Sequence, residues 1–277
     1  MSRWNNKVVL ITGGSAGLGL QLAKSCYAQG AIVILVARDH DRLNVAKAEV
    51  EKHRPEPILR SQRVLTYAAD ITSDEQVSRL AEWVGTEIGT LDVLVNVAGK
   101  SDRGRADMVP VARYAELLEL NFLATVRCTQ MLLPMIKASQ GSIVNIGSLA
   151  SKTASGFLGA YPSSKFPVAA FSQQLRLELA EEGVHILLVC PGPIAREDAG
   201  TRYDDQSSDL PESARKPGGG AKVKALSPIE LSQRIMSACE RRSPELVIPG
   251  KARILFAIQQ LFPRLGDWLC RKMTGNS

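Results

Sequence analysis

The residues best suited to chemistry in this sequence are Tyr161 and Lys165, a phenol and an ammonium four positions apart. On a helix such positions lie on one face, one turn apart. Because a nearby cation favours the phenolate, we expect Lys165 to lower the pKa of Tyr161 from about 10, so that the phenol can act as a general acid or base near neutral pH. Ser148, at the end of an expected strand, could hydrogen-bond a substrate oxygen. The same tyrosine–lysine spacing also occurs by chance on exposed helices.

A glycine-rich turn near the N-terminus could bind phosphate. The apolar run 8–11 predicts a buried strand, and residues 18–29 predict a helix that ends at Gly30. The glycines between them follow the spacing GxxxGxG rather than the commoner GxGxxG. At a strand–helix junction they would let backbone N–H groups approach a pyrophosphate, although they could also form only a tight turn. The residues expected to contact a dinucleotide are Gly13, Ser15, Gly17, Leu18 and Gly19.

The end of the second expected strand distinguishes between the two nicotinamide cofactors. An NAD-binding protein usually has an acidic residue there, which hydrogen-bonds the ribose 2′-OH. This sequence has Ala37 and Arg38 instead, with Arg42 one turn later. A guanidinium can bind a 2′-phosphate with two parallel hydrogen bonds. The sequence therefore favours NADP(H), with Arg38 as the binding residue, although Asp39 could partly neutralise it and a solvated surface arginine is the alternative.

Short apolar runs alternate with helical patterns along the chain. Strands are expected at 8–11, 32–36, 64–68, 91–96, 141–146, 184–189 and 245–249, and helices at 18–29, 39–53, 74–88, 112–136 and 161–182. Apolar strands separated by helices predict a parallel sheet that is covered on both faces. We therefore predict an α/β chain with the doubly wound parallel sheet of the Rossmann fold, as a single domain over residues 1–277.

The composition excludes several classes of protein. With 45% hydrophobic and 22% charged residues, the chain is of the globular type. The net charge is +6, the basic residues occur along the whole sequence rather than in one block, and nucleic acid is the least supported partner. The five cysteines form no CxxC pair and the three histidines lie near no cysteine pair, so we expect reduced thiols and no metal. No signal peptide and no apolar run of about 18 residues is seen, so the expected location is cytoplasmic.

Two segments depart from the alternating pattern. Residues 195–226 are polar and rich in glycine and proline, which is typical of a substrate loop or a disordered segment, and the glycines 218–220 could act as a hinge. Residues 251–272 form an amphipathic C-terminal segment, split by Pro263, in which apolar and aromatic residues are flanked by basic ones. Such a segment packs on the protein body or a neighbouring subunit, or makes peripheral contact with a membrane surface.

Together these residues resemble the short-chain dehydrogenase/reductase family over nearly the whole chain. Each motif is weak alone, but their order and spacing are those of the family. The motifs are Thr12-Gly13-x-x-x-Gly17-x-Gly19, Asp70, Asn96-Val97-Ala98-Gly99, Asn121, Ser148, Tyr161-x-x-x-Lys165 and Pro191-Gly192. The resemblance implies an NADP(H)-dependent oxidoreductase that interconverts a ketone and a secondary alcohol by hydride transfer.

The resemblance also implies a role for each motif. Tyr161 would exchange the proton with the substrate oxygen, and Lys165 would lower its pKa and hold the nicotinamide ribose. Ser148 would orient that oxygen, and Asn121 would hold a water in a proton relay. Contacts with the cofactor's adenine and adenine-ribose are implied for Asp70, Ile71, Asn96, Ala98 and Gly99, and contacts with its nicotinamide for Pro191, Gly192 and Ile194.

Three positions depart from the family pattern. Val97 replaces a second asparagine, which removes an amide that could tie neighbouring strands. Arg196 stands where a cofactor-contacting threonine is common. Pro167 lies in the expected catalytic helix, where it predicts a local kink. None of these changes affects the residues that transfer the proton.

The sequence leaves the substrate open. The C-terminal segment is loosely similar to those of the 3-ketosphinganine reductases, which would imply a long-chain, lipid-like ketone at a membrane surface. A non-catalytic NADP-binding regulatory protein is the competing class, although such a protein would not need the phenol. The family resemblance also implies a homo-oligomer, a dimer or a tetramer, formed through the helix after Asn96 and the helix that carries Tyr161.

Overall fold

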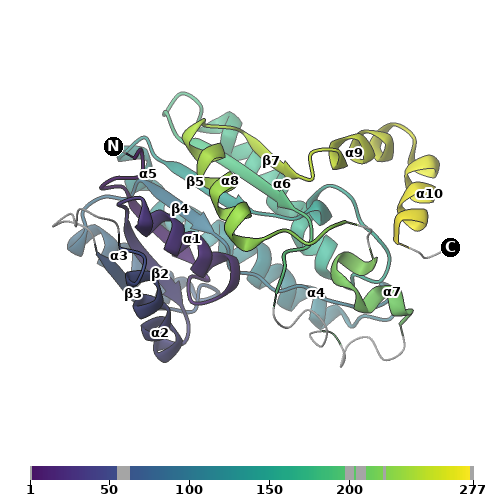
Figure 1. Ribbon diagram of the computed structural model, residues 1–277, viewed down its shortest axis with the longest axis horizontal. Helices are drawn as coiled ribbons and strands as arrows, with labels where there is room; N and C mark the ends of the chain where they lie inside the picture. Colours follow the sequence, from purple (N-terminus) through teal and green to yellow (C-terminus); the bar gives the residue numbers. More distant parts are fainter. Residues whose placement is uncertain (1, 55–62, 197–202, 204–209, 221–222, 275–277) are drawn as a thin grey trace.

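A computed structural model of the chain describes residues 2–54, 63–196, 203, 210–220 and 223–274. It contains a seven-stranded sheet in the order β3-β2-β1-β4-β5-β6-β7, and every neighbouring pair is parallel (Figure 1). The strands are β1 (Val8–Thr12), β2 (Ile32–Ala37), β3 (Val64–Ala68), β4 (Val93–Asn96), β5 (Ser142–Ile146), β6 (His185–Pro191) and β7 (Glu245–Ile248). The prediction of a doubly wound parallel sheet in a single α/β domain is confirmed.

Helices cover both faces of this sheet. One apolar core lies between the sheet and the helices α1 (Gly17–Ala28), α2 (His40–Glu51) and α8 (Pro228–Glu240). A second core lies between the opposite face and the helices α3 (Asp74–Glu87), α5 (Ala124–Ala138) and α6 (Tyr161–Glu178). Alternate residues of each central strand enter opposite cores, as Val9 and Leu10 of β1 do. Burial on both faces explains why these strands read as unbroken apolar runs.

The helix expected at 112–136 consists of three successive segments. They are α4 (Val111–Leu118), a π-helical turn η1 (Glu119–Leu123) and α5. Such π turns inside helices often lie at functional sites, and this one contains Asn121. In α6, the helix continues without interruption through Pro167 to Glu178. The kink expected there therefore does not end the helix.

The remaining elements lie around the carboxyl ends of the strands and at the C-terminus. The short helix η2 (Leu149–Ser151) follows β5, and α7 (Glu212–Arg215) and η4 (Pro217–Gly220) belong to the segment after β6. Two further helices, α9 (Ala252–Leu261) and α10 (Pro263–Thr274), form the C-terminal segment, which extends from the end of the sheet near β7 (yellow in Figure 1). The break between them falls at Pro263, as the sequence predicted.

Candidate active site

A cavity of about 870 Å³ opens at the carboxyl ends of the central strands. In doubly wound folds this edge of the sheet, near the point where the strand order reverses, is where ligands bind. All of the predicted site residues line the cavity except Asn96 and Asn121. The glycine turn and Arg38 lie in one part of the wall, and Ser148, Tyr161 and Lys165 in another. Residues far apart in the sequence are thus brought to one place.

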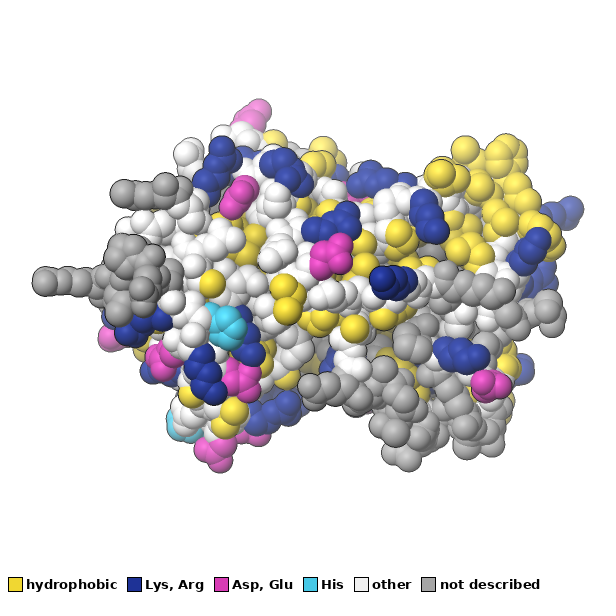
Figure 2. All heavy atoms as spheres, in the orientation of Figure 1, with side chains coloured by type: hydrophobic (Ala, Val, Ile, Leu, Met, Phe, Trp, Pro, Cys, Tyr) yellow, Lys and Arg dark blue, Asp and Glu magenta, His cyan; other side chains and the backbone are white. Residues whose placement is uncertain are grey.

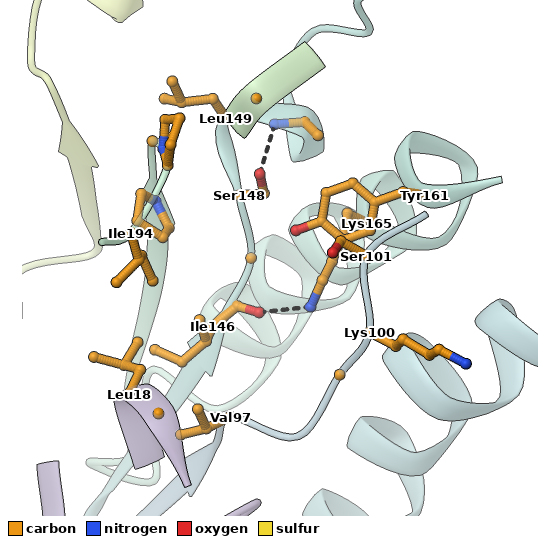
Figure 3. A pocket seen from close by; sticks show the side chains of 18 of the residues that line it. Leu18, Val97, Lys100, Ser101, Ile146, Ser148, Leu149, Tyr161, Lys165 and Ile194 are labelled. Atoms are coloured by element: carbon orange, nitrogen blue, oxygen red, sulfur yellow. Dashed lines mark hydrogen bonds between the residues drawn. The ribbon is translucent and has the colours of Figure 1, made fainter. Parts of the chain in front are cut away.

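The proposed catalytic groups come from two adjacent elements. Tyr161 and Lys165 occupy the first turns of α6, while Ser148 lies two positions after the end of β5 and is the N-cap of η2. The Ser148 hydroxyl accepts a hydrogen bond from the N–H of Ala150 (3.1 Å), and the Ser148 N–H donates to Ser151 Oγ (3.0 Å). In Figure 3 the phenol oxygen of Tyr161 lies between the Ser148 hydroxyl and the Lys165 ammonium. A substrate oxygen could therefore contact Ser148 and Tyr161 together.

Lys165 is held deep in the protein. Its side chain is only 4% exposed, and Nζ donates a hydrogen bond to the carbonyl oxygen of Ile146 at 2.9 Å (Figure 3). Burial disfavours the ammonium and lowers the pKa of Lys165 to about 8. A side-chain carbon at Gly99 would lie only 3.4 Å from Nζ. The glycine therefore keeps open the space beside the lysine.

In the protein without cofactor, the pKa of Tyr161 is not lowered overall, although its spacing from Lys165 led us to expect this. The pKa of Tyr161 is raised, because the surrounding protein disfavours the charged phenolate, and Tyr203 and Cys190 add to this effect. A hydrogen bond with Ser148 and the positive charge of Arg103 oppose the rise. Lys165 is itself desolvated. The phenol is therefore kept in its protonated form, the state that a proton donor needs.

Asn121 does not reach the cavity. It is fully buried in η1, its Oδ1 accepts a hydrogen bond from the N–H of Lys100 (2.7 Å), and its Nδ2 donates to the carbonyl of Lys100 (2.9 Å) and to Ser164 Oγ (2.8 Å). The amide therefore joins the loop after β4 to the helix that carries Tyr161. The structure thus gives Asn121 a positioning role, and the predicted water relay stays a prediction.

Asn96 has a similar structural role. Its Nδ2 donates to Asn145 Oδ1 (2.9 Å) on β5 and to Thr129 Oγ1 (3.2 Å) on α5. The tie between neighbouring strands, expected to be weakened by Val97, is supplied by this amide. Backbone N–H groups of Val97 and Ala98 also contact Thr12 Oγ1. Ala98 and Gly99, by contrast, line the cavity as predicted.

The glycine turn is shaped to receive an anion. Gly13 and Gly17 adopt positive φ angles of 68° and 54°, which glycine reaches without strain. A side-chain carbon at Gly17 would meet no atom within 4 Å, so the turn faces open space, and α1 begins there with no acidic residue in its first turn and no side-chain cap. Unsatisfied N–H groups and the helix dipole favour negative charge at this point. These residues fit the pyrophosphate of a dinucleotide.

The cavity wall beyond the turn contains the basic residues that were predicted. Arg38 and Arg42 are exposed there, while the Asp39 side chain accepts a hydrogen bond from the Arg42 N–H at 3.0 Å and caps α2. Asp70 accepts hydrogen bonds from the N–H and hydroxyl of Thr72, which lower its pKa against the effect of burial. Arg38 adds to this lowering. The residues present therefore fit a cofactor with a 2′-phosphate.

The sequence reasoning missed two adjacent residues, Asp102 and Arg103. The Asp102 carboxylate is 2% exposed, accepts two hydrogen bonds from Arg113 (2.8 and 3.0 Å), and accepts another from the N–H of Ala160 (3.1 Å), the residue before Tyr161. Arg103 lines the cavity, and its side chain holds the segment after β6. The sequence signal available was an Asp-Arg pair that begins three positions after Gly99, and such a pair does not indicate which residues it contacts.

The segment after β6 is described only in part. Of the expected substrate loop at 195–226, residues 197–202, 204–209 and 221–222 lie outside the described residues. Arg196, Tyr203, Gly218 and Val223 line the cavity, which supports the prediction that this segment bounds the substrate site. The glycines at 218–220, expected as a hinge, lie in the short helix η4.

Within the described part of the chain, no cluster of residues could hold a metal ion, and no helix is long and apolar enough to cross a membrane.

Comparison with known proteins identifies the class. The sequence model of the short chain dehydrogenase family matches residues 7–207, and the chain belongs to this family of oxidoreductases. A 3-ketodihydrosphingosine reductase of Mus musculus is 34% identical over 185 residues, which cover 66% of this chain and 55% of that relative. A Dictyostelium discoideum dehydrogenase/reductase SDR family protein 7-like is 29% identical over 278 residues, covering 100% of this chain and 84% of the relative.

Solved structures agree with this assignment. L-sorbose reductase from Gluconobacter frateurii, in complex with NADPH and L-sorbose, superimposes with a TM-score of 0.75 at 25% identity, covering 88% of this chain and 95% of that chain. The relatives thus include reductases whose names point to very different substrates, a lipid-like ketone and a sugar.

Proposed function

We propose that this protein is an NADP(H)-dependent reductase that interconverts a ketone and a secondary alcohol. The observation that carries the proposal is the convergence of Ser148, Tyr161 and Lys165 on the cavity that also contains the glycine turn. When bound, the nicotinamide cofactor would supply or accept the hydride. The chain's own residues would bind it, orient the substrate oxygen and transfer the proton.

The proton step follows from the positions of the side chains. Ser148 would donate a hydrogen bond to the carbonyl oxygen and place it beside Tyr161. Because the raised pKa keeps the phenol protonated, Tyr161 can donate its proton as negative charge develops on that oxygen. The buried Lys165 next to it would provide positive charge when protonated, which stabilises the phenolate that remains. In the oxidative direction Tyr161 would accept the proton from the alcohol.

We propose NADP(H) rather than NAD(H) because Ala37 and the exposed Arg38 stand where an NAD-binding protein usually has a carboxylate, and the exposed Arg42 follows one turn later. The test is the dissociation constant of each reduced cofactor, measured by fluorescence titration. NADPH should bind at least about tenfold more tightly than NADH, since charge-assisted hydrogen bonds contribute ~1.5–3 kcal/mol. Arg38→Asp should remove that preference, whereas the exposed Arg234→Asp on α8 should leave it unchanged. Equal affinities in the native protein would contradict the assignment.

We propose that the substrate is a lipophilic ketone. Part of the cavity wall consists of side chains from the C-terminal helices, and these are largely apolar, among them Leu255, Ile258, Leu269 and Met273. Such a wall favours a hydrocarbon chain over a sugar, because burying apolar area stabilises a complex by ~25 cal/mol per Å². The similarity to a 3-ketodihydrosphingosine reductase agrees with this choice.

The test of both proposals is NADPH oxidation with ketones of graded chain length and polarity. Activity should rise with chain length and be weak on hydroxylated ketones. Preference for polyhydroxylated ketones would refute the lipophilic substrate but leave the reductase in place. Tight NADPH binding without turnover of any ketone or alcohol would instead support a non-catalytic NADP-binding protein.

A further inference from the structure

The C-terminal arm, which we define as α9 and α10, is attached to the body at few points. Its helices pack closely against each other, with Gly266 beside Gln259, and Gln259 donates to Asp267 Oδ1 (2.7 Å). On its inner side Phe256 packs in a small apolar cluster that includes Val247 of β7. No residue of α9 is buried. The arm is therefore a formed helical pair that extends from the end of the sheet near β7 (Figure 1), and one of its sides lines the cavity.

The outward side of the arm is rich in large apolar side chains. Leu261 is 72% exposed and Phe262 62%, and Leu265 and Trp268 are also exposed; none of these four residues lines the cavity. Figure 2 shows hydrophobic side chains gathered at the end of the molecule where the arm lies, with basic side chains beside them. Scattered exposed apolar residues are normal in monomeric proteins, but a patch containing two aromatic side chains marks an interaction surface.

The inner side of the same arm forms part of the wall of the catalytic cavity. Leu255, Ile258, Leu269 and Met273 line the cavity, while Phe262, between the two helices, and Trp268 of α10 do not. The arm therefore separates the reacting groups from whatever covers its outer surface. An apolar molecule bound at that outer surface would be one helix layer away from the cavity.

The charge of the arm indicates what covers it. Residues 251–274 contain five basic side chains and only one acidic one, so this short stretch carries most of the chain's net charge of +6. Arg253 pairs with Glu245 (3.3 Å), and the Lys272 ammonium lies 5.0 Å from the centre of the Trp268 ring. Among the described residues, Arg264 and Arg271 form no ion pair, and neither lines the cavity. Exposed apolar residues bordered by unpaired cations match the boundary of an anionic bilayer.

A second copy of the chain fits this surface less well. A two-fold contact would place the same patch of each subunit against the other. The basic side chains of one arm would then face those of its partner, and like charges at close range repel. Lipid phosphates, in contrast, would neutralise these cations while the acyl chains receive the aromatic side chains.

We propose that the C-terminal arm docks this protein on an anionic membrane surface, with Phe262 and Trp268 inserted at the headgroup boundary and Arg264 and Arg271 on lipid phosphates. The docked arm places the apolar wall of the cavity next to the bilayer, so that a lipophilic ketone can enter without crossing water. The docking rests on the arm alone, whereas the delivery of substrate rests on the proposed function.

Co-sedimentation of the full chain with vesicles tests the docking without reference to catalysis. The protein should bind vesicles of phosphatidylcholine with phosphatidylglycerol, bind pure phosphatidylcholine more weakly, and lose binding as salt rises. The double variant Arg264→Glu, Arg271→Glu should lower the partition coefficient on anionic vesicles by at least roughly tenfold. Each cation near an anionic surface strengthens membrane binding, and the variant replaces two cations by anions. Phe262→Ser with Trp268→Ser should reduce binding to both kinds of vesicle.

Matched controls lie elsewhere on the surface. Leu177→Ser removes an apolar side chain that is 71% exposed on α6, and Arg79→Glu reverses an exposed charge on α3. Both should bind vesicles like the native chain. No binding to anionic vesicles, or equal binding by the native chain and the arm variants, would overturn the proposal. Loss of a dimer in sedimentation velocity on Phe262→Ser with Trp268→Ser would overturn it in favour of a second copy.

A separate measurement tests whether the same variants keep their catalytic activity. None of the four substituted arm residues lines the cavity, so NADPH oxidation with a small water-soluble ketone should be the same in every variant. If vesicle binding fails while this activity persists, the docking proposal is wrong and the proposed function stands. If the activity is absent but vesicle binding follows the prediction, the proposed function is wrong and the docking proposal stands.

Discussion

Arg103 is the residue through which the substrate side of the cavity is held together. It is 5% exposed, and its Nε donates to the carbonyl of Ala214 (2.7 Å), its Nη1 to that of Asp102 (2.7 Å) and its Nη2 to that of Lys216 (3.3 Å). Its guanidinium carbon also lies 3.7 Å from the centre of the Tyr203 ring. One side chain thus connects the loop after β4 with two parts of the segment after β6.

The Arg103→Met variant removes these hydrogen bonds while retaining much of the side-chain volume. Each buried carbonyl that loses its donor costs ~1–3 kcal/mol, and the cation–π contact contributes ~1–2 kcal/mol. A loss of only ~1.4 kcal/mol in the ordering of the segment corresponds to a tenfold effect on binding. We therefore expect the KM for the ketone to rise at least roughly tenfold, with a smaller change in NADPH affinity.

The charge of Arg103 has a second, separable effect. Because this cation lowers the pKa of Tyr161, its removal should raise that pKa further. Ketone reduction needs the protonated phenol, so the alkaline limb of kcat/KM should move to higher pH in Arg103→Met. Arg103→Lys keeps the positive charge but loses the planar set of N–H donors of the guanidinium. Its KM should therefore rise while its pH profile stays near that of the native protein.

Steady-state kinetics across pH, with the exposed Arg105→Met as a control, decides the question. Among the residues that the structure describes, the Arg105 side chain pairs with Asp107 alone, so its loss should change neither parameter. An unchanged KM in Arg103→Met would show that the contacts with Ala214 and Lys216 do not order the site. Identical pH profiles for the Met and Lys variants would refute the electrostatic link to Tyr161.

Two further predictions concern stability. Asp102→Asn should lower the free energy of unfolding by roughly 2–4 kcal/mol, because it leaves the Arg113 guanidinium without its buried carboxylate beside Ala160; a change below about 1 kcal/mol in urea unfolding would show that the pair is dispensable. In the cofactor-free protein, burial lowers the pKa of Lys165 from 10.5 to about 8, so as pH rises through this interval the folded chain releases a proton that the unfolded chain still holds. The native protein should therefore gain stability relative to Lys165→Met between pH 8 and 10.5, by roughly 3 kcal/mol in all, and a difference that does not vary with pH would contradict the burial.

Much of the fold could be predicted because the strands are buried on both faces. An apolar run such as Ile32–Ala37 has few alternatives once helices flank it, and Gly30, with a φ of 95°, ends the preceding helix as expected. The positions of Tyr161, Lys165 and the glycine turn follow from the same alternation, because parallel strands bring their carboxyl ends to one edge.

Other features depend on contacts that no sequence pattern specifies. Whether the amides of Asn96 and Asn121 face the cavity or join neighbouring segments depends on partners 21 to 49 positions away. The pKa of Tyr161 is governed by burial, which outweighs the effect expected from its neighbour on the helix. Asp102 and Arg103 were missed for the same reason, since Ala160 and Ala214 are adjacent to them only in the folded chain.

The most direct test of the central claim is the Tyr161→Phe variant, measured for NADPH affinity and for kcat on the best ketone. General acid catalysis contributes ~10²–10⁴-fold, so kcat should fall by about that factor while the dissociation constant of NADPH stays within about twofold. Retention of most of the turnover would contradict the role of Tyr161 as proton donor. A parallel loss of NADPH binding would show that the phenol acts in holding the cofactor rather than in the proton step.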